Sequence, residues 1–243
     1  MKWRLWLVII TTMLAYTSLA WKIYNLQIEK GDYYLARAAS LRGSRTNFLD
    51  PDRGSLYFTD AAQTRIPAAL NKEYPVIFAV PQEINDSQEA AQALSPIVQT
   101  DAKKLQAMLS KPADLYELLA IRATDAQVEA VQKLDIKGIY IHDEPFRFYP
   151  FGTSAAHILG FVGPNDKNPL IEGRYGLEAH YNDQLRSRDL VLTIDRNIQA
   201  HAEQVLREVI KRYRATGGTV IVQDPSTGKI LALGNYPSFD PNV

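Results

Sequence analysis

An uncharged, apolar run at residues 5–21 is the first strong pattern along the chain. It contains seventeen residues without a charged side chain, and as a helix it would reach roughly 25 Å. Trp3 and Trp6 lie at one boundary of this run, and Trp21 and Tyr24 lie at the other. Amphipathic rings at both ends of an apolar helix are typical of a membrane-spanning segment. The pattern therefore predicts a single N-terminal transmembrane helix.

Two basic residues, Lys2 and Arg4, precede the apolar run. The positive-inside rule then predicts a cytoplasmic N-terminus and an extracytoplasmic body, on a single-pass protein of the cell membrane. A cleaved signal peptide is the main alternative, because Ser18, Leu19 and Ala20 resemble a cleavage site. A buried core helix is a further alternative, but it would leave the boundary tryptophans unexplained.

Beyond the apolar run, short alternating segments are interspersed with segments of helical periodicity. The alternating segments predict strands at residues 55–59, 65–70, 74–80, 116–122, 139–142, 190–194, 219–223 and 230–234. Helices are predicted at residues 25–40, 90–98, 101–109, 125–134 and 196–216. Asp86 or Ser87 can cap the second of these, Asp101 the third and Asp195 the last, which Gly217 and Gly218 end. Pro75 places its strand at a sheet edge or at the start of a strand. The order of these elements predicts an α+β fold.

Composition narrows the class of protein. Among 243 residues, 27 Lys and Arg balance 27 Asp and Glu, so we expect no nucleic-acid partner. Cysteine is absent, which excludes disulfides, lipid attachment to cysteine and cysteine nucleophiles. Four histidines are scattered without metal-ligand spacing, and the chain contains no glycine-rich phosphate loop. We therefore expect no metal and no cofactor.

Five blocks of residues, in order along nearly the whole chain, resemble the class B penicillin-binding proteins. Three blocks correspond to their pedestal (dimerisation) domain: Arg53-Gly54; Arg147-x-Tyr149-Pro150 with His157, Gly160 and Gly163; and Gly173-x-x-Gly176-Leu177-Glu178 with Tyr181 and Leu185. Two blocks correspond to the opening of their transpeptidase domain: Leu192-Thr193-Ile194-Asp195 with Gln199; and Asp224-Pro225 through Ala232, followed by Pro237-Ser238-Phe239-Asp240-Pro241-Asn242.

The resemblance implies three parts. These are a cytoplasmic tip and transmembrane anchor at residues 1–24, a mixed α/β pedestal at residues 25–188, and the truncated start of a β-lactamase/transpeptidase-like domain at residues 189–243. The residues that match structural family motifs are Arg53, Gly54, Arg147, Tyr149, Pro150, His157, Gly160, Gly176, Leu177, Glu178 and Asp195. Glu178 is expected to pair with backbone or arginine, and His157 to be a hydrogen-bonded structural residue.

Catalytic motifs of such enzymes are missing from this chain. Enzymes of this family are acylated on a serine that lies one helical turn from a lysine, and they also use Ser-x-Asn and Lys-Thr-Gly elements. A literal Ser-x-x-Lys occurs at Ser226 and Lys229, but it lies in a predicted turn between strands, where no helix aligns the two side chains. We therefore expect no catalytic residue within the chain and no activity of the chain alone.

The resemblance implies the anchor and pedestal of a serine D,D-transpeptidase that cross-links peptidoglycan in cell division or elongation. It implies as partners the cell membrane, a SEDS-type membrane glycosyltransferase and other wall-synthesis proteins. Peptidoglycan and β-lactams would bind the catalytic domain. The alternative is a non-enzymatic, membrane-anchored scaffold that binds wall-synthesis partners. An apolar helix face and a strand edge left uncovered at residues 189–243 argue against this alternative.

Overall fold

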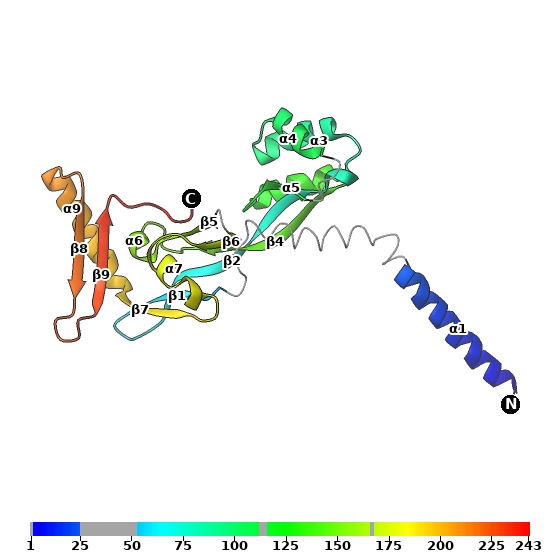
Figure 1. Ribbon diagram of the computed structural model, residues 1–243, viewed down its shortest axis with the longest axis horizontal. Coiled ribbons are helices and arrows are strands. Elements are labelled where there is room, and N and C mark those ends of the chain that lie inside the picture. Colours follow the sequence, from blue (N-terminus) through cyan, green and yellow to red (C-terminus); the bar gives the residue numbers. More distant parts are fainter. Residues whose placement is uncertain (1, 25–52, 112–115, 166–167) are drawn as a thin grey trace. The chain divides into compact units, whose positions relative to one another are not determined.

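The computed structural model describes residues 2–24, 53–111, 116–165 and 168–243 (Figure 1). The chain divides into two compact units. Unit 1 comprises residues 1–44, 78–119 and 130–140, and unit 2 comprises residues 45–77, 120–129 and 141–243. Helices and strands occur in both units, so the predicted α+β class is confirmed.

The N-terminal apolar run lies in one helix, α1 (Lys2–Tyr24). Within the described part of the chain, no helix combines the length and the apolar character needed to cross a membrane. The helix predicted at residues 25–40 lies outside the described residues.

Unit 1 contains a helical pair, α3 (Ser87–Val98) and α4 (Ala102–Leu109), preceded by a short 3-10 helix, η2 (Pro81–Glu83). Both helices begin where the sequence predicts, because aspartates cap them. Asp86 accepts from the backbone N–H groups of residues 88 and 89, and Asp101 from those of residues 103 and 104. The helices bury their apolar faces, with the buried side chains Ala90, Ala91, Leu94, Val98, Leu105 and Leu109.

A five-stranded sheet is the central element of the fold. Its strands are β1 (Leu56–Thr59), β2 (Ile66–Ala79), β3 (Glu117–Ala120), β4 (Ile139–Phe148) and β7 (Leu190–Asp195). The order is β3-β2-β1-β7, and β4 also pairs with β2. Leu56 of β1 lies opposite Ala69 of antiparallel β2 and opposite Leu190 of parallel β7. The first and last strands of this sheet in the chain are therefore neighbours.

The prediction of two strands at residues 65–70 and 74–80 is wrong. One strand, β2, runs through the polar stretch, and Pro75 lies in its interior rather than at its start. Two contacts explain this. The Asn71 side chain donates to the carbonyl of Arg53 instead of forming a turn, and the carbonyl of Pro75 accepts from the N–H of Ala123.

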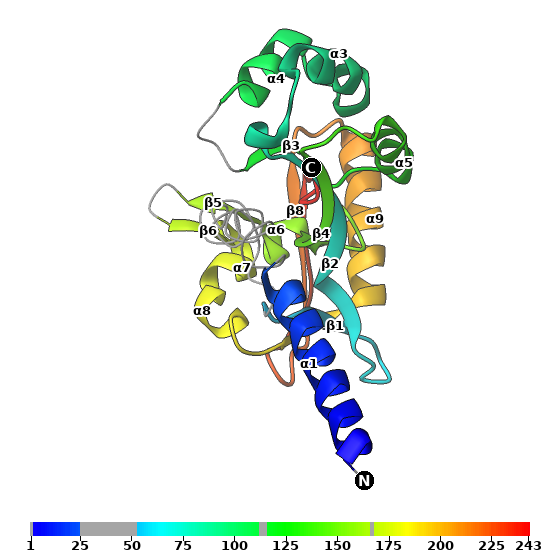
Figure 2. The ribbon, with the colours of Figure 1, turned by 90° about the vertical axis from the view of Figure 1, so that its right-hand side faces the viewer.

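Helix α5 (Asp125–Leu134) lies where the sequence predicts it. Beyond β4, the short helices α6 (Ala156–Leu159), α7 (Gly176–His180) and α8 (Asn182–Leu185) are present. A hairpin of β5 (Val162–Asn165) and β6 (Asn168–Gly173), visible beside α7 in Figure 2, lies where no strand is predicted. Both of its strands contain proline or glycine, which obscured the strand pattern.

The C-terminal part of unit 2 is the helix α9 (Arg196–Tyr213) packed on the hairpin of β8 (Gly218–Gln223) and β9 (Ile230–Tyr236) (Figure 1). Asp195 caps α9, accepting from the N–H groups of residues 197 and 198. The predicted end of this helix at Gly217 and Gly218 is wrong. The helix ends at Tyr213, Arg214 caps it in the left-handed conformation, and Gly218 begins β8.

Helix α9 is fixed to β9 by a buried amide. The Gln199 side chain donates to the carbonyl of Leu233 and accepts from the N–H of Leu233, both at 2.9 Å. One face of α9 buries Ala202, Leu206 and Ile210. Val205 and Val209 of the same helix remain 42% and 43% exposed, so part of its apolar surface is uncovered in this chain.

Candidate functional site

A buried carboxylate, Glu178 at the start of α7, lies between two buried arginines. Arg53 donates to Oε2 from Nε at 2.9 Å and from Nη2 at 2.6 Å. Arg147 donates to Oε1 from Nε at 2.6 Å. The side chains of Glu178 and Arg147 are fully buried, and that of Arg53 is nearly so. These are short, charge-assisted hydrogen bonds in a region that excludes water.

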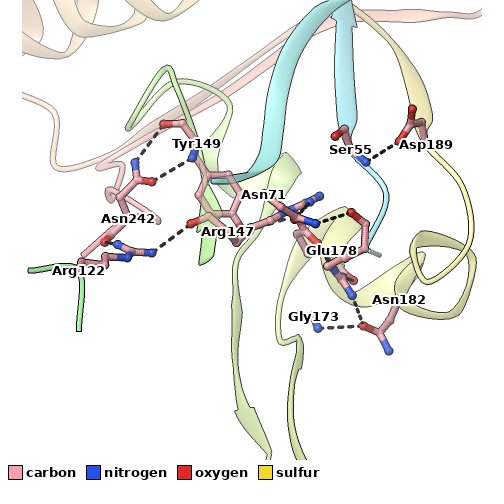
Figure 3. A network of polar contacts seen from close by, with 11 residues as sticks. Ser55, Asn71, Arg122, Arg147, Tyr149, Gly173, Glu178, Asn182, Asp189 and Asn242 are labelled. Carbon is pink, nitrogen blue, oxygen red and sulfur yellow. Dashed lines mark hydrogen bonds and ion pairs between the residues drawn. The ribbon is translucent and has the colours of Figure 1, made fainter. Parts of the chain in front are cut away.

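Neighbouring asparagine side chains accept further hydrogen bonds from the two arginines (Figure 3). Arg147 Nη1 donates to Asn71 Oδ1, and Arg53 Nη1 donates to Asn182 Oδ1, both at 2.9 Å. Asn182 also accepts from the N–H of Gly173 at 3.0 Å. The Tyr149 hydroxyl lies 3.5 Å from Glu178 Oε1. We call this set of residues the Glu178 cluster: Arg53, Asn71, Arg147, Tyr149, Glu178 and Asn182.

Charge and burial decide what the Glu178 cluster can do. Burial raises the pKa of the Tyr149 phenol well above its ordinary value, and the charge of Glu178 adds to this effect. The phenol therefore stays protonated at neutral pH. Because Glu178 is saturated with donors and closed to solvent, it is not placed to exchange protons with a substrate. The cluster fixes geometry instead.

The cluster joins distant parts of the chain. Arg53 precedes β1, Asn71 lies within β2, Arg147 lies near the end of β4, and Glu178 belongs to α7. Beside the cluster, the N–H of Gly54 donates to the carbonyl of Leu185 at 2.6 Å. The N–H of Ser55 donates to Asp189 Oδ1 at 2.7 Å. These bonds hold the short connector at residues 185–189, which leads into β7.

Among the sequence-predicted motif residues, Arg53, Arg147, Tyr149 and Glu178 meet in the cluster. The expected contact of Glu178 with arginine is present. The glycines Gly160 and Gly176 lie against each other, where α6 ends and α7 begins, with Leu177 next in the chain. Pro150 follows Tyr149 outside the cluster, and Asp195 caps α9. Asn71 and Asn182 also belong to the cluster, but the sequence does not predict them. Each is a polar residue in a strand or helix and belongs to no recognised motif.

His157 contacts the ring of Phe239 edge-to-face, with ring centres 5.0 Å apart. Its predicted hydrogen bond stays a prediction. Among the residues that the structure describes, no group of three or more His, Cys, Asp or Glu side chains is placed to hold a metal ion.

The Ser-x-x-Lys sequence lies in the β8–β9 turn, as predicted, and not on a helix. Ser226 Oγ donates to Asp224 Oδ1 at 2.7 Å, and Thr227 Oγ1 donates to Asp224 Oδ2 at 2.6 Å. These hydroxyl groups lower the pKa of Asp224 to about 2. A carboxylate that binds protons so weakly is a poor general base for Ser226. This turn is built as an aspartate-stabilised turn rather than as a nucleophile site.

Comparison with known proteins agrees with this geometry. Residues 49–222 match the family described as "Penicillin-binding Protein dimerisation domain". The chain belongs to this family. The match includes all the residues of the Glu178 cluster and extends beyond β7 into β8.

Curated relatives of this dimerisation-domain chain are longer proteins. The chain is 26% identical to the peptidoglycan D,D-transpeptidase FtsI of Escherichia coli K12 over 99% of its own length and 45% of that protein. It is 24% identical to the stage V sporulation protein D of Bacillus subtilis, over 82% of the chain and 34% of that protein. The chain thus spans less than half the length of these relatives.

A solved structure shows the same fold. The crystal structure of penicillin-binding protein 2X from Streptococcus thermophilus superposes with a TM-score of 0.56 at 17% identity. The superposition covers 81% of this chain and 36% of that protein.

Proposed function

We propose that this chain is the N-terminal part of a class B penicillin-binding protein that takes part in peptidoglycan cross-linking. The observation that carries the proposal is the coverage of the curated D,D-transpeptidases: FtsI aligns with 99% of the chain, and the MrdA protein of Escherichia coli with 91%. The pedestal would comprise residues 25–188, and residues 189–243 would begin a transpeptidase domain. The exposed valines of α9 support this, because further sequence could cover them.

The role of the chain itself is structural in this proposal. The Glu178 cluster would hold a rigid pedestal, and the tied connector at residues 185–189 would set the position of the catalytic domain. Wall-synthesis proteins, including a SEDS-type membrane glycosyltransferase, would be its partners, as the relationship to FtsI and MrdA suggests. Peptidoglycan and β-lactams would bind the catalytic domain and not the described residues.

Acylation by a fluorescent penicillin tests the enzymatic part of the proposal. The 243-residue chain is expected to remain unlabelled, and Ser226→Ala is expected to change nothing, because Ser226 is bonded to Asp224 in a turn. Sequencing of the DNA beyond the Val243 codon is expected to find Ser-x-x-Lys, Ser-x-Asn and Lys-Thr-Gly in frame. The extended protein would then be labelled.

A confirmed stop codon directly after Val243 would contradict the transpeptidase proposal and favour the non-enzymatic scaffold. Labelling of the 243-residue chain that is lost in Ser226→Ala would contradict the assignment of Ser226 as a turn residue.

We further propose, from the sequence pattern, that the N-terminal apolar run anchors the protein in the cell membrane, with the N-terminus in the cytoplasm and the body outside. The support is the uncharged run at residues 5–21 with Trp3, Trp6 and Trp21 at its boundaries, preceded by Lys2 and Arg4. Protein extracted from membranes with detergent is expected to retain its original N-terminus. A mature chain that begins at Trp21 would show a cleaved signal peptide instead.

A further inference from the structure

Residues 238–242, which we call the latch segment, lie against the loop at residues 149–155 and the aromatic residues that follow it. Ser238 Oγ donates to the carbonyl of Thr153 at 2.8 Å. The ring of Phe239 contacts His157 and Phe161 edge-to-face, with ring centres 5.0 and 5.9 Å apart. The family match ends at residue 222, so the latch segment lies beyond it. The latch segment and the residues that it contacts, Thr153, His157 and Phe161, all belong to unit 2.

Asn242 makes the most specific contact of the latch segment. Its Oδ1 accepts from the N–H of Tyr149 at 2.9 Å, and its Nδ2 donates to the carbonyl of Tyr149 at 3.0 Å. The side-chain amide thus pairs with one residue of backbone in both directions, as a neighbouring strand would. Asp240 Oδ1 holds this amide in place, accepting from Asn242 Nδ2 at 2.8 Å. An aspartate at position 242 would lack the donor for the carbonyl of Tyr149.

Arg122 connects the latch segment to β4. Its guanidinium lies over the rings of Tyr74 and Phe146, at 5.5 and 5.4 Å from their centres. Nη1 donates to the carbonyl of Asn242, and Nη2 donates to the carbonyl of Arg147 at 3.0 Å. Arg122 has a φ of 51°, a left-handed conformation that costs about 1 kcal/mol or more in a non-glycine residue. The surrounding contacts must hold Arg122 in this conformation.

The latch contacts and the Glu178 cluster share residues 147–149 (Figure 3). The backbone of Arg147 and Tyr149 binds Arg122 and Asn242, while their side chains face Glu178. We propose that the loop at residues 149–155, together with Arg122, is a recognition surface for the latch segment, and that its occupation is coupled to the Glu178 cluster. Any sequence joined to Asn242 would then be oriented relative to the pedestal. Arg122 is the positioning residue.

Hydrogen exchange of the Tyr149 amide in the full chain tests the recognition surface, because this N–H is bonded to Asn242. Asn242→Ala is expected to accelerate its exchange about tenfold, through loss of two hydrogen bonds. Arg122→Ala is expected to act in the same direction. In the double variant, the acceleration of exchange should be much smaller than the product of the two single accelerations, because both residues hold one segment.

Two controls separate a latch from general loosening. Asn235→Ala removes an exposed amide that bonds Thr219 on the same C-terminal part of the chain, and it should leave the Tyr149 amide unchanged. Arg122→Lys retains the charge but not the two-pronged geometry, and it should rescue little. Unchanged exchange in Asn242→Ala, or fully multiplicative effects in the double variant, would overturn the recognition surface.

A second measurement uses the absence of cysteine from the chain. A Thr153→Cys, Ser238→Cys pair is expected to form a disulfide under mild oxidation, more slowly when Asn242→Ala is added. For the coupling, Asn71→Ala removes the bond from Arg147 and the bond to the carbonyl of Arg53, and neither bond involves the latch segment. It is expected to accelerate both the exchange of the Tyr149 amide and the release of the latch. If neither Asn242→Ala nor Asn71→Ala changed the rate of disulfide formation, the proposal would be overturned. Neither the exchange nor the disulfide measurement depends on transpeptidase activity.

Discussion

Replacing Glu178 by glutamine is expected to lower the free energy of unfolding of unit 2 by about 3–5 kcal/mol. Glutamine has nearly the same shape, but it leaves the buried guanidinium groups of Arg53 and Arg147 without a counter-charge. Its amide nitrogen would also face an arginine N–H group, so a donor would meet a donor. The loss is therefore much larger than that of a single neutral hydrogen bond.

Urea denaturation followed by circular dichroism measures this effect. Tryptophan fluorescence is unsuitable, because all three tryptophans lie in α1 and outside unit 2. Glu172→Gln is the matched control: it removes the carboxylate from a partly exposed ion pair with Arg186 in the same unit. Exposed pairs contribute about 0–1 kcal/mol. Equal losses of stability in the two variants would show that the buried cluster does not support the fold as argued.

Local signals in the sequence predict much of this fold because they act within a few residues. Asp86, Asp101 and Asp195 each begin a helix at the expected place, since a capping carboxylate needs only the next three N–H groups. The alternation at Leu56 and Phe58 likewise identifies β1, both of whose apolar side chains are fully buried. These assignments require no knowledge of distant partners.

Where long-range contacts override local preference, the sequence is misleading. Asparagine is common in turns, yet the Asn71 side chain bonds the carbonyl of Arg53 and the guanidinium of Arg147, which lies 76 residues away. Strand β2 therefore continues through it. The resemblance to a family singled out Arg53 and Glu178, but it did not place them together, because 125 residues separate them along the chain. Convergence of this kind depends on packing rather than on local pattern.

Replacing Gly160 by alanine is expected to lower the free energy of unfolding of unit 2 by about 4 kcal/mol or more, although it adds only one methyl group. Gly160 ends α6 with a φ of 76°, and an added Cβ would lie 1.8 Å from the carbonyl oxygen of Tyr175. That oxygen belongs to backbone at the start of α7, which cannot rotate away as a side chain could. Gly176 approaches from the other side, since its own Cβ would lie 2.6 Å from the Gly160 nitrogen.

Gly228→Ala is the control for placing alanine at a positive φ where no backbone lies close. Gly228 has nearly the same φ, 75°, but the nearest atom to its added Cβ is the side-chain nitrogen of Gln223 at 3.8 Å. Its replacement should therefore cost only the left-handed penalty of about 1–2 kcal/mol. The difference between the two variants in urea denaturation then measures the close backbone packing of α6 on α7 together with the additional strain at Gly160, whose ψ of −154° lies in a region essentially restricted to glycine. This packing holds Glu178 at the N-terminal end of α7, so Gly160→Ala should also expose the Glu178 cluster to solvent. Similar losses in both variants would mean that α6 and α7 can move apart without disturbing the cluster.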